Sequence, residues 1–189
     1  MSEPAPPAAP RLPSAHPSHA YYRACEGRWS GPLDFVVTDW RALGATPLAL
    51  ADRLTVLSLA WGTRFLGALR IETSVDYASG AARGVVVHTT RISKWGLTLL
   101  RGIETLRLDA NGRDLTMDAE TRMVSTPWRT TRFTGAPASV DEAGMRATYR
   151  FPYVGTEMRQ RGERSADGTT VTLTQETAFS RGVQVLRRS

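Results

Sequence analysis

Three side chains in this sequence combine reactive chemistry with a position inside an ordered domain. His88 is the one histidine outside a proline-rich N-terminal stretch, which holds the other two. Glu104 shares a strand face with leucines, where an apolar neighbourhood would suit it to proton transfer. Tyr149 could orient a substrate or stabilise an oxyanion. Glu104, His88 and Tyr149 are therefore the catalytic candidates for an isomerase, cyclase or hydratase acting by acid–base proton transfer.

Two of these assignments have simpler alternatives. Glu104 lies two residues from Gly102, so it could stand at a rim that water reaches. The loop at Ala78–Ala82 admits two registers, and they send His88 to opposite faces of its strand. The enzyme hypothesis therefore depends on whether these side chains share one face.

The sequence lacks the motifs of metal, nucleophilic and nucleotide chemistry. One ordered histidine and one cysteine, Cys25, cannot supply a typical zinc site. Neither a Gly-x-Ser-x-Gly elbow nor a glycine-rich phosphate loop is present. We expect no metal and no cofactor. A single cysteine also cannot form an internal disulfide, which favours a reducing, cytoplasmic location.

A meander of short strands must position the candidate residues. From Leu66 onward, apolar and polar residues alternate with a period of two, which is typical of strands with one buried face. After a first strand within residues 27–40 and a second from residue 66, we expect strands at 84–92, 103–109, 113–123, 145–151, 156–164, 169–179 and 183–188. Hairpin connections between neighbours predict a mainly β chain: a single antiparallel up-and-down barrel of about eight to ten strands.

One helix is expected, at Pro47–Trp61, between the first two strands. Thr46 is a suitable N-cap, and Gly62 stands where a helix would stop. The segment is too short to span a bilayer, and we expect no transmembrane segment. Residues 1–22 have the composition of a disordered Pro/Ala-rich tail without a secretory signal, which leaves 23–189 as one barrel domain.

The hairpin turns fix which residues share a face. A two-residue turn at Asn111–Gly112 pairs Glu104 with Ala119, and one at 167–168 pairs Gln160 with Gln175. A turn at 152–155 places Tyr149 beside Met158, and a three-residue turn at 180–182 places Arg187 on the inside. The predicted inner face is therefore partly polar. A solid core would bury these polar groups without hydrogen bonds, which costs free energy, so a ligand cavity explains the pattern better.

In this register an arginine flanked by amides could anchor a carboxylate or another polar head, while aliphatic side chains contact an apolar body. The ligand-binding candidates are Arg187, Gln175, Gln160, Tyr149, Met158 and Leu173. Alternatively, Arg187 closes the barrel end by covering an aromatic ring.

The chain is basic, with 24 Lys+Arg against 18 Asp+Glu and a formal charge of +6. The strand arginines alternate with acids and threonines on the predicted outer face. A nucleic-acid groove needs basic residues clustered with aromatics on one surface. The pattern therefore favours a solvated barrel exterior over nucleic-acid binding.

Gly27-Arg28-Trp29 opens the first strand, and arginines lie near the end of the last. This combination resembles the Gly-x-Trp and late-arginine signature of the calycin group, which contains lipocalins and fatty-acid-binding proteins. The helix between the first two strands is more similar to the fatty-acid-binding type. The resemblance implies a closed barrel that carries a hydrophobic small molecule, with Trp29 at the barrel base and Arg187 or Arg188 over it.

Two function classes remain from the sequence. The first is binding of a small hydrophobic or amphipathic molecule in a barrel lumen. The second is a cofactor-independent barrel enzyme that acts by proton transfer. A third and weaker hypothesis is an interaction module that uses the apolar helix at 47–61.

Overall fold

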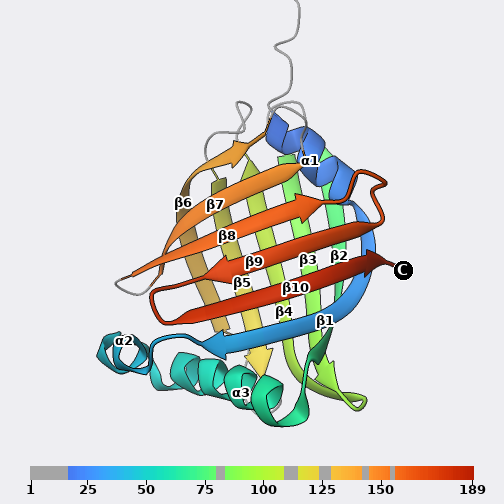
Figure 1. The fold of residues 1–189 in the computed structure, drawn as a ribbon. Helices are drawn as coiled ribbons and strands as arrows, with labels where there is room; N and C mark the ends of the chain where they lie inside the picture. The colour runs from blue at the N-terminus through green and yellow to red at the C-terminus, as the bar shows by residue number, and fades with distance from the viewer. Residues whose placement is uncertain (1–16, 80–83, 109–114, 124–128, 142–144, 154–155) are drawn as a thin grey trace, which may run out of the picture.

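The computed structural model describes residues 17–79, 84–108, 115–123, 129–141, 145–153 and 156–189 (Figure 1). Ten strands and three helices occur in these ranges. The strands are β1 (Gly27–Val37), β2 (Leu69–Ser79), β3 (Gly84–Lys94), β4 (Leu97–Leu108), β5 (Leu115–Met123), β6 (Arg129–Val140), β7 (Arg146–Tyr153), β8 (Thr156–Arg164), β9 (Thr170–Glu176) and β10 (Ser180–Arg188). The helices are α1 (Pro17–Cys25), α2 (Trp40–Ala45) and α3 (Leu50–Leu66).

The strands form one antiparallel sheet that curls into a barrel. Each strand pairs with its neighbour in sequence, and β1 pairs with both β2 and β10, so the ladder returns to its first strand. The prediction of a mainly β chain built from one antiparallel meander is confirmed. In Figure 1, α1 lies at one end of the barrel, and α2 and α3 lie at the other.

The helical prediction was incomplete, since two further helices occur besides α3. Thr46 does not begin α3; it ends α2, with its backbone N–H and hydroxyl both donating to the Ala42 carbonyl at 2.9 and 2.7 Å. Gly62 does not stop α3 but packs against Leu69, and the helix ends at Leu66, before Gly67, whose φ of 73° is one that glycine adopts more readily than other residues.

The expectation of disorder through residue 22 is wrong for residues 17–22, which belong to α1. The helix forms because Tyr21 and Tyr22 are buried against the barrel, each only 3% exposed. The free energy gained by burying two aromatic rings offsets the loss of conformational entropy when one short helix becomes ordered. The rest of the predicted tail, residues 1–16, lies outside the described residues.

The Asn-Gly and Asp-Gly hairpins have the predicted registers. Glu104 pairs with Ala119 across β4 and β5, and Gln160 pairs with Gln175 across β8 and β9. Ala119 and Gln160 are both buried. The predicted inner faces of these four strands are therefore correct.

The connection between β7 and β8 is tighter than predicted. Tyr149 pairs with Gln160 rather than with Met158, because Tyr153 pairs directly with Thr156. A shift of two residues preserves the face of a strand. Tyr149 therefore still points into the barrel, as expected.

The prediction that Arg187 points into the barrel is wrong. β10 is displaced from the predicted register by an odd number of residues, so Leu186 is buried and Arg187 is exposed on the outer face. The turn from β9 occurs earlier than its glycine suggests. The Thr177 hydroxyl accepts from the backbone N–H groups of Phe179 and Ser180, at 3.2 and 3.0 Å, and fixes the turn there.

The buried apolar side chains form two clusters. The larger fills the barrel between α1 and the strands. The smaller lies where α2 and α3 cover the opposite end, and it includes Val37, Leu43, Val56 and the fully buried Phe179. Each end of the barrel is therefore closed by helices, in two different ways.

Candidate functional site

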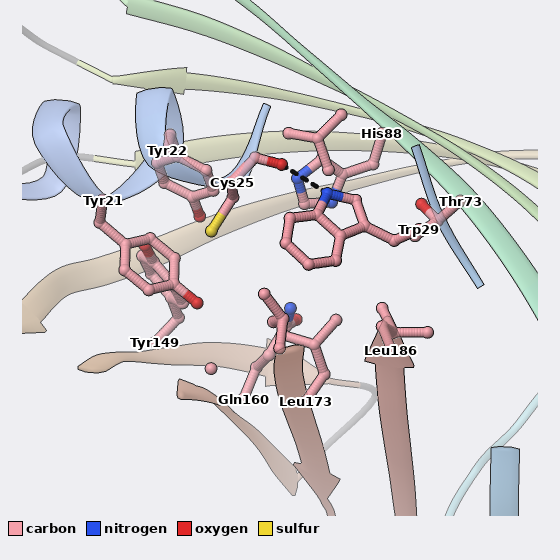
Figure 2. A pocket seen from close by; sticks show the side chains of 13 residues that line it. Tyr21, Tyr22, Cys25, Trp29, Thr73, His88, Tyr149, Gln160, Leu173 and Leu186 are labelled. Atoms are coloured by element: carbon pink, nitrogen blue, oxygen red, sulfur yellow. Dashed lines mark hydrogen bonds between the residues drawn. The ribbon is translucent and has the colours of Figure 1, made fainter. Parts of the chain in front are cut away.

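A cavity of about 40 Å³ lies inside the barrel beneath α1 (Figure 2). Three of its lining residues, Tyr21, Tyr22 and Cys25, come from α1. Those from the strands are Trp29, Thr73, Val75, His88, Tyr149, Gln160, Gly162, Val171, Leu173 and Leu186. The lining is mostly aromatic and aliphatic, with a few polar groups, as in sites for small molecules.

Helix α1 fills the barrel mouth with its two tyrosines. The Tyr21 hydroxyl lies against Gly162 of β8, where an added Cβ would stand 2.0 Å from that oxygen. Glycine at position 162 therefore provides the space that the Tyr21 side chain occupies. The tyrosine pair acts as a plug, and we call Tyr21 and Tyr22 the tyrosine plug.

The C-terminal end of α1 is held by a tryptophan and an arginine. The Trp29 indole N–H donates to the Cys25 carbonyl at 2.7 Å (Figure 2). The Arg188 guanidinium lies 4.9 Å from the centre of the Trp29 ring and donates to the carbonyls of Ala24 and Glu26, at 3.3 and 3.0 Å. The arginine that covers an aromatic ring is therefore Arg188 rather than Arg187.

His88 points into the barrel, which resolves the two registers left open by the sequence. It pairs with Glu104 across β3 and β4, and its Nδ1 lies 3.6 Å from a Glu104 carboxylate oxygen. Its Nε2 is buried without a hydrogen-bond partner among the described residues. One ring nitrogen therefore faces a carboxylate, and the other is free to bond a ligand.

Tyr149 contributes a second such atom, its hydroxyl oxygen, which makes no well-aligned hydrogen bond in the described part of the chain, although the Tyr22 hydroxyl lies close enough to interact with it. The ring of Tyr22 lies between the two, with its centre 5.9 Å from that of Tyr149 and 6.1 Å from that of His88. Burial raises the pKa of Tyr149 well above its usual value, and the same cause raises the pKa of Tyr22. Both phenols therefore stay protonated at neutral pH.

Cys25 is not a reactive nucleophile. Burial raises the pKa of its thiol to about 11, so the thiolate is scarce at neutral pH. No group of three or more His, Cys, Asp or Glu side chains in the described ranges is arranged to hold a metal ion. Nor does any helix described here have the length and apolar character needed to cross a membrane.

Only some of the ligand-binding residues predicted from the sequence line the cavity. Gln160 and Leu173 line it, as does Tyr149. Met158 and Gln175 are half-buried and are not among its lining residues, while Arg187 is exposed. Glu104 reaches the site through His88, with a side chain 28% exposed.

Sequence reasoning missed the tyrosine plug, because it assigned residues 17–22 to a tail. A signal was present: two adjacent aromatic residues and a cysteine lie directly before the first strand. Val171 shares the inner face of Leu173 in the correctly predicted β8–β9 hairpin and could have been assigned to the cavity. Leu186 was missed because β10 was predicted in the wrong register, and Thr73 because the connection after β2 left its pairing open.

Comparison with known proteins identifies no family for this chain. No family model matches the sequence, and no curated protein matches it. The assignment of function therefore depends on the site itself: a mostly apolar cavity inside the barrel, with His88 on one wall, Glu104 behind it, and the buried Tyr149 phenol on another wall.

Proposed function

We propose that this protein binds a small, largely apolar molecule with one hydrogen-bonding end inside the barrel. The observation that carries the proposal is that one cavity holds two buried polar atoms that make no well-aligned hydrogen bond to any described residue, His88 Nε2 and the Tyr149 hydroxyl oxygen. Each such atom costs about 1–3 kcal/mol when it is left unbonded. A polar group of a ligand placed near both would recover that free energy.

The size of the cavity limits how such a molecule enters. About 40 Å³ holds a few water molecules, whereas small-molecule sites span roughly 300–1,000 Å³. Tyr21 and Tyr22 occupy the mouth of the barrel, so a larger ligand enters by displacing α1. The tyrosine plug then holds the lumen closed when no ligand is bound.

The calycin resemblance supports this proposal. Trp29 and Arg188 stack at the end of the barrel, in the arrangement that the resemblance implies for its tryptophan and late arginine. We infer a calycin-like barrel whose lumen carries the ligand, with Gln160, Leu173 and Tyr149 on its wall.

Native mass spectrometry of the full-length protein, together with titration of a fluorescent fatty acid, tests the proposal. We expect a saturable signal that Tyr149→Phe and His88→Phe each weaken about fivefold to tenfold, because each removes one hydrogen-bonding partner. Arg187→Ala is the matched control and should leave the affinity unchanged. Absence of both a bound molecule and saturable binding would contradict the proposal.

A specific observation also favours the acid–base enzyme. The 3.6 Å approach of Glu104 to His88 Nδ1 can orient the imidazole, so that Nε2 takes or gives a proton in the cavity. Tyr149 is placed to donate to an oxyanion. A ligand recovered by the first experiment can be incubated with the protein in D2O and weighed by mass spectrometry. Enzymatic proton transfer predicts deuterium uptake that Glu104→Gln abolishes while binding persists.

A further inference from the structure

The end of the barrel that α2 and α3 cover is unusually apolar on its outside. Of the ten large hydrophobic residues that are exposed in the described ranges, nine lie between Val36 and Leu97, and Val185 on β10 is the other. The most exposed are Trp95 at 77%, Leu50 at 74% and Phe65 at 73%. Trp40 and Trp61 are both more than half exposed and line one surface groove with Val36.

Helix α3 is apolar on both of its faces. Val56, Ala60 and Thr63 face the barrel and are buried. Leu50 and Phe65 mark the two ends of an outward row that also contains Leu54 and Trp61, and it runs about 22 Å along the helix. A helix that is apolar all round is normally covered on all sides. The outward row of α3 therefore lacks a covering partner in the described chain.

The turn between β3 and β4 extends this surface. The Lys94 ammonium donates to the Ala68 carbonyl at 2.8 Å, which holds the turn beside the segment that follows α3. Trp95 and Leu97 are exposed on the turn. Figure 1 shows this hairpin end and α3 at the same end of the barrel. We call the exposed side chains of Trp40, Leu50, Trp61, Phe65, Trp95 and Leu97 the tryptophan face.

Cations outnumber acids beside the tryptophan face. Residues 34–67 and 93–98 contain four cations, Arg41, Arg53, Arg64 and Lys94, against three aspartates, one of which, Asp34, lines the same groove. Arg53 donates to the Gly44 and Thr46 carbonyls, at 3.5 and 3.1 Å. Arg64 lies 5.7 Å from the ring centre of Phe65, and Lys94 lies 5.8 Å from that of Trp95.

The arginines of the barrel wall behave differently. Seven of them pair with acids of the same or the adjacent strand: Arg70, Arg91, Arg107, Arg146, Arg159, Arg161 and Arg181. These seven arginines are therefore compensated within the wall. At the tryptophan face, Arg64 and Lys94 instead lie beside exposed aromatic rings, and the excess of cations over acids there favours an external anion.

We propose that the tryptophan face docks onto a membrane that contains anionic phospholipid. Tryptophan is favoured where an apolar medium meets water, because its ring is apolar and its N–H is polar. Arginine and lysine beside inserted aromatic rings match the phosphate layer above the acyl chains. The apolar side chains come from three separate segments, and a bilayer accepts them without a complementary rigid shape. This inference does not depend on the ligand proposed for the lumen.

Vesicle co-sedimentation of the full-length protein tests the inference. We expect binding to vesicles of equal parts phosphatidylcholine and phosphatidylserine, weaker binding to phosphatidylcholine alone, and release by salt. The double variant Trp61→Ser and Phe65→Ser should reduce binding at least tenfold, because it removes two rings that insert. Arg41→Gln with Arg64→Gln should reduce it about fivefold per cation.

Val185→Ser is the matched control, since it removes an exposed apolar side chain from the barrel wall, and it should bind as the wild type does. Circular dichroism verifies that each variant is folded. Failure of the wild type to bind the mixed vesicles would overturn the inference. An equal loss of vesicle binding in Val185→Ser would also overturn it. So would a wild type that binds no vesicles but self-associates, if the Trp61→Ser and Phe65→Ser double variant abolishes that self-association.

Discussion

The two ends of the barrel use aromatic residues in opposite ways. At the α1 end, Tyr21, Tyr22 and Trp29 point inward and are at most 3% exposed. At the α2–α3 end, Trp40 and Trp61 point outward and are more than half exposed. The difference shows that one end uses its aromatic residues to close a cavity, and the other presents them to the surroundings.

The largest expected difference between the ends concerns two tryptophans. Trp29→Ala should lower the free energy of unfolding by about 3–5 kcal/mol, because it empties the core and removes the hydrogen bond to Cys25. Trp61→Ala should change it by about 0.5 kcal/mol or less, because the side chain is already exposed. Urea unfolding of both variants measures the contrast. Equal losses would mean that the exposed end is part of the core.

The second prediction concerns alkaline pH. The folded pKa of Cys25 is about 11 against 9.0 for the free thiol, so the folded state keeps its proton where the unfolded state loses it. The stability from this group is therefore present below about pH 9 and lost as the pH rises to about 11. The free energy of unfolding should therefore fall by about 2–3 kcal/mol over this pH range.

Urea unfolding across that pH range, in the wild type and in Cys25→Ala, checks the prediction. The variant should lose less stability than the wild type over the same range. Identical pH dependence in the two proteins would show that the Cys25 thiol is not desolvated when the protein folds.

The third prediction compares two glycines. Gly162→Ala places a Cβ against the Tyr21 hydroxyl. The substitution should lower the free energy of unfolding by about 1–3 kcal/mol or force α1 outward. The Cys25 thiol should then react faster with a thiol reagent such as dithionitrobenzoate. Gly44→Ala in α2 meets nothing within 4 Å and should not destabilise the protein. Slow labelling of Gly162→Ala at wild-type stability would contradict the fit of Tyr21 against β8.

The smallest expected effects come from two hydroxyls. Tyr149→Phe removes a hydroxyl that makes no well-aligned hydrogen bond to any described residue, so the free energy of unfolding should stay the same or rise by up to about 1 kcal/mol. Thr63→Val removes a hydroxyl that donates to the Phe35 and Leu59 carbonyls, and it should cost about 1 kcal/mol. Thermal unfolding of the two variants distinguishes them. Equal destabilisation would indicate that the Tyr149 hydroxyl is bonded within the protein.

The parts of the fold that follow from local chemistry could be predicted from the sequence. A two-residue turn closed by glycine sets the register of its own hairpin, which is why the pairs Glu104–Ala119 and Gln160–Gln175 were correct. The period-two alternation likewise identified the strands around them. Residues on these hairpins could therefore be assigned to the inside of the barrel from the amino-acid pattern alone.

The failures arose where distant residues decide the outcome. The position of Arg187 depended on a turn that the Thr177 hydroxyl fixes, and an error of one residue reverses every side chain of the strand. Tyr21 and Tyr22 are ordered by β7 and β8, more than a hundred residues later in the chain. The orientation of His88 depended on the pairing of β3 with β4, because its own turn was ambiguous.

The central claim is that a ligand enters the barrel at the α1 end by displacing the tyrosine plug. Hydrogen–deuterium exchange of the full-length protein, with and without a saturating fluorescent fatty acid, tests it most directly. We predict faster exchange of the α1 amides when the fatty acid is bound, with α2 and α3 unchanged. Unchanged or slower exchange in α1, or a change confined to α2 and α3, would contradict the claim.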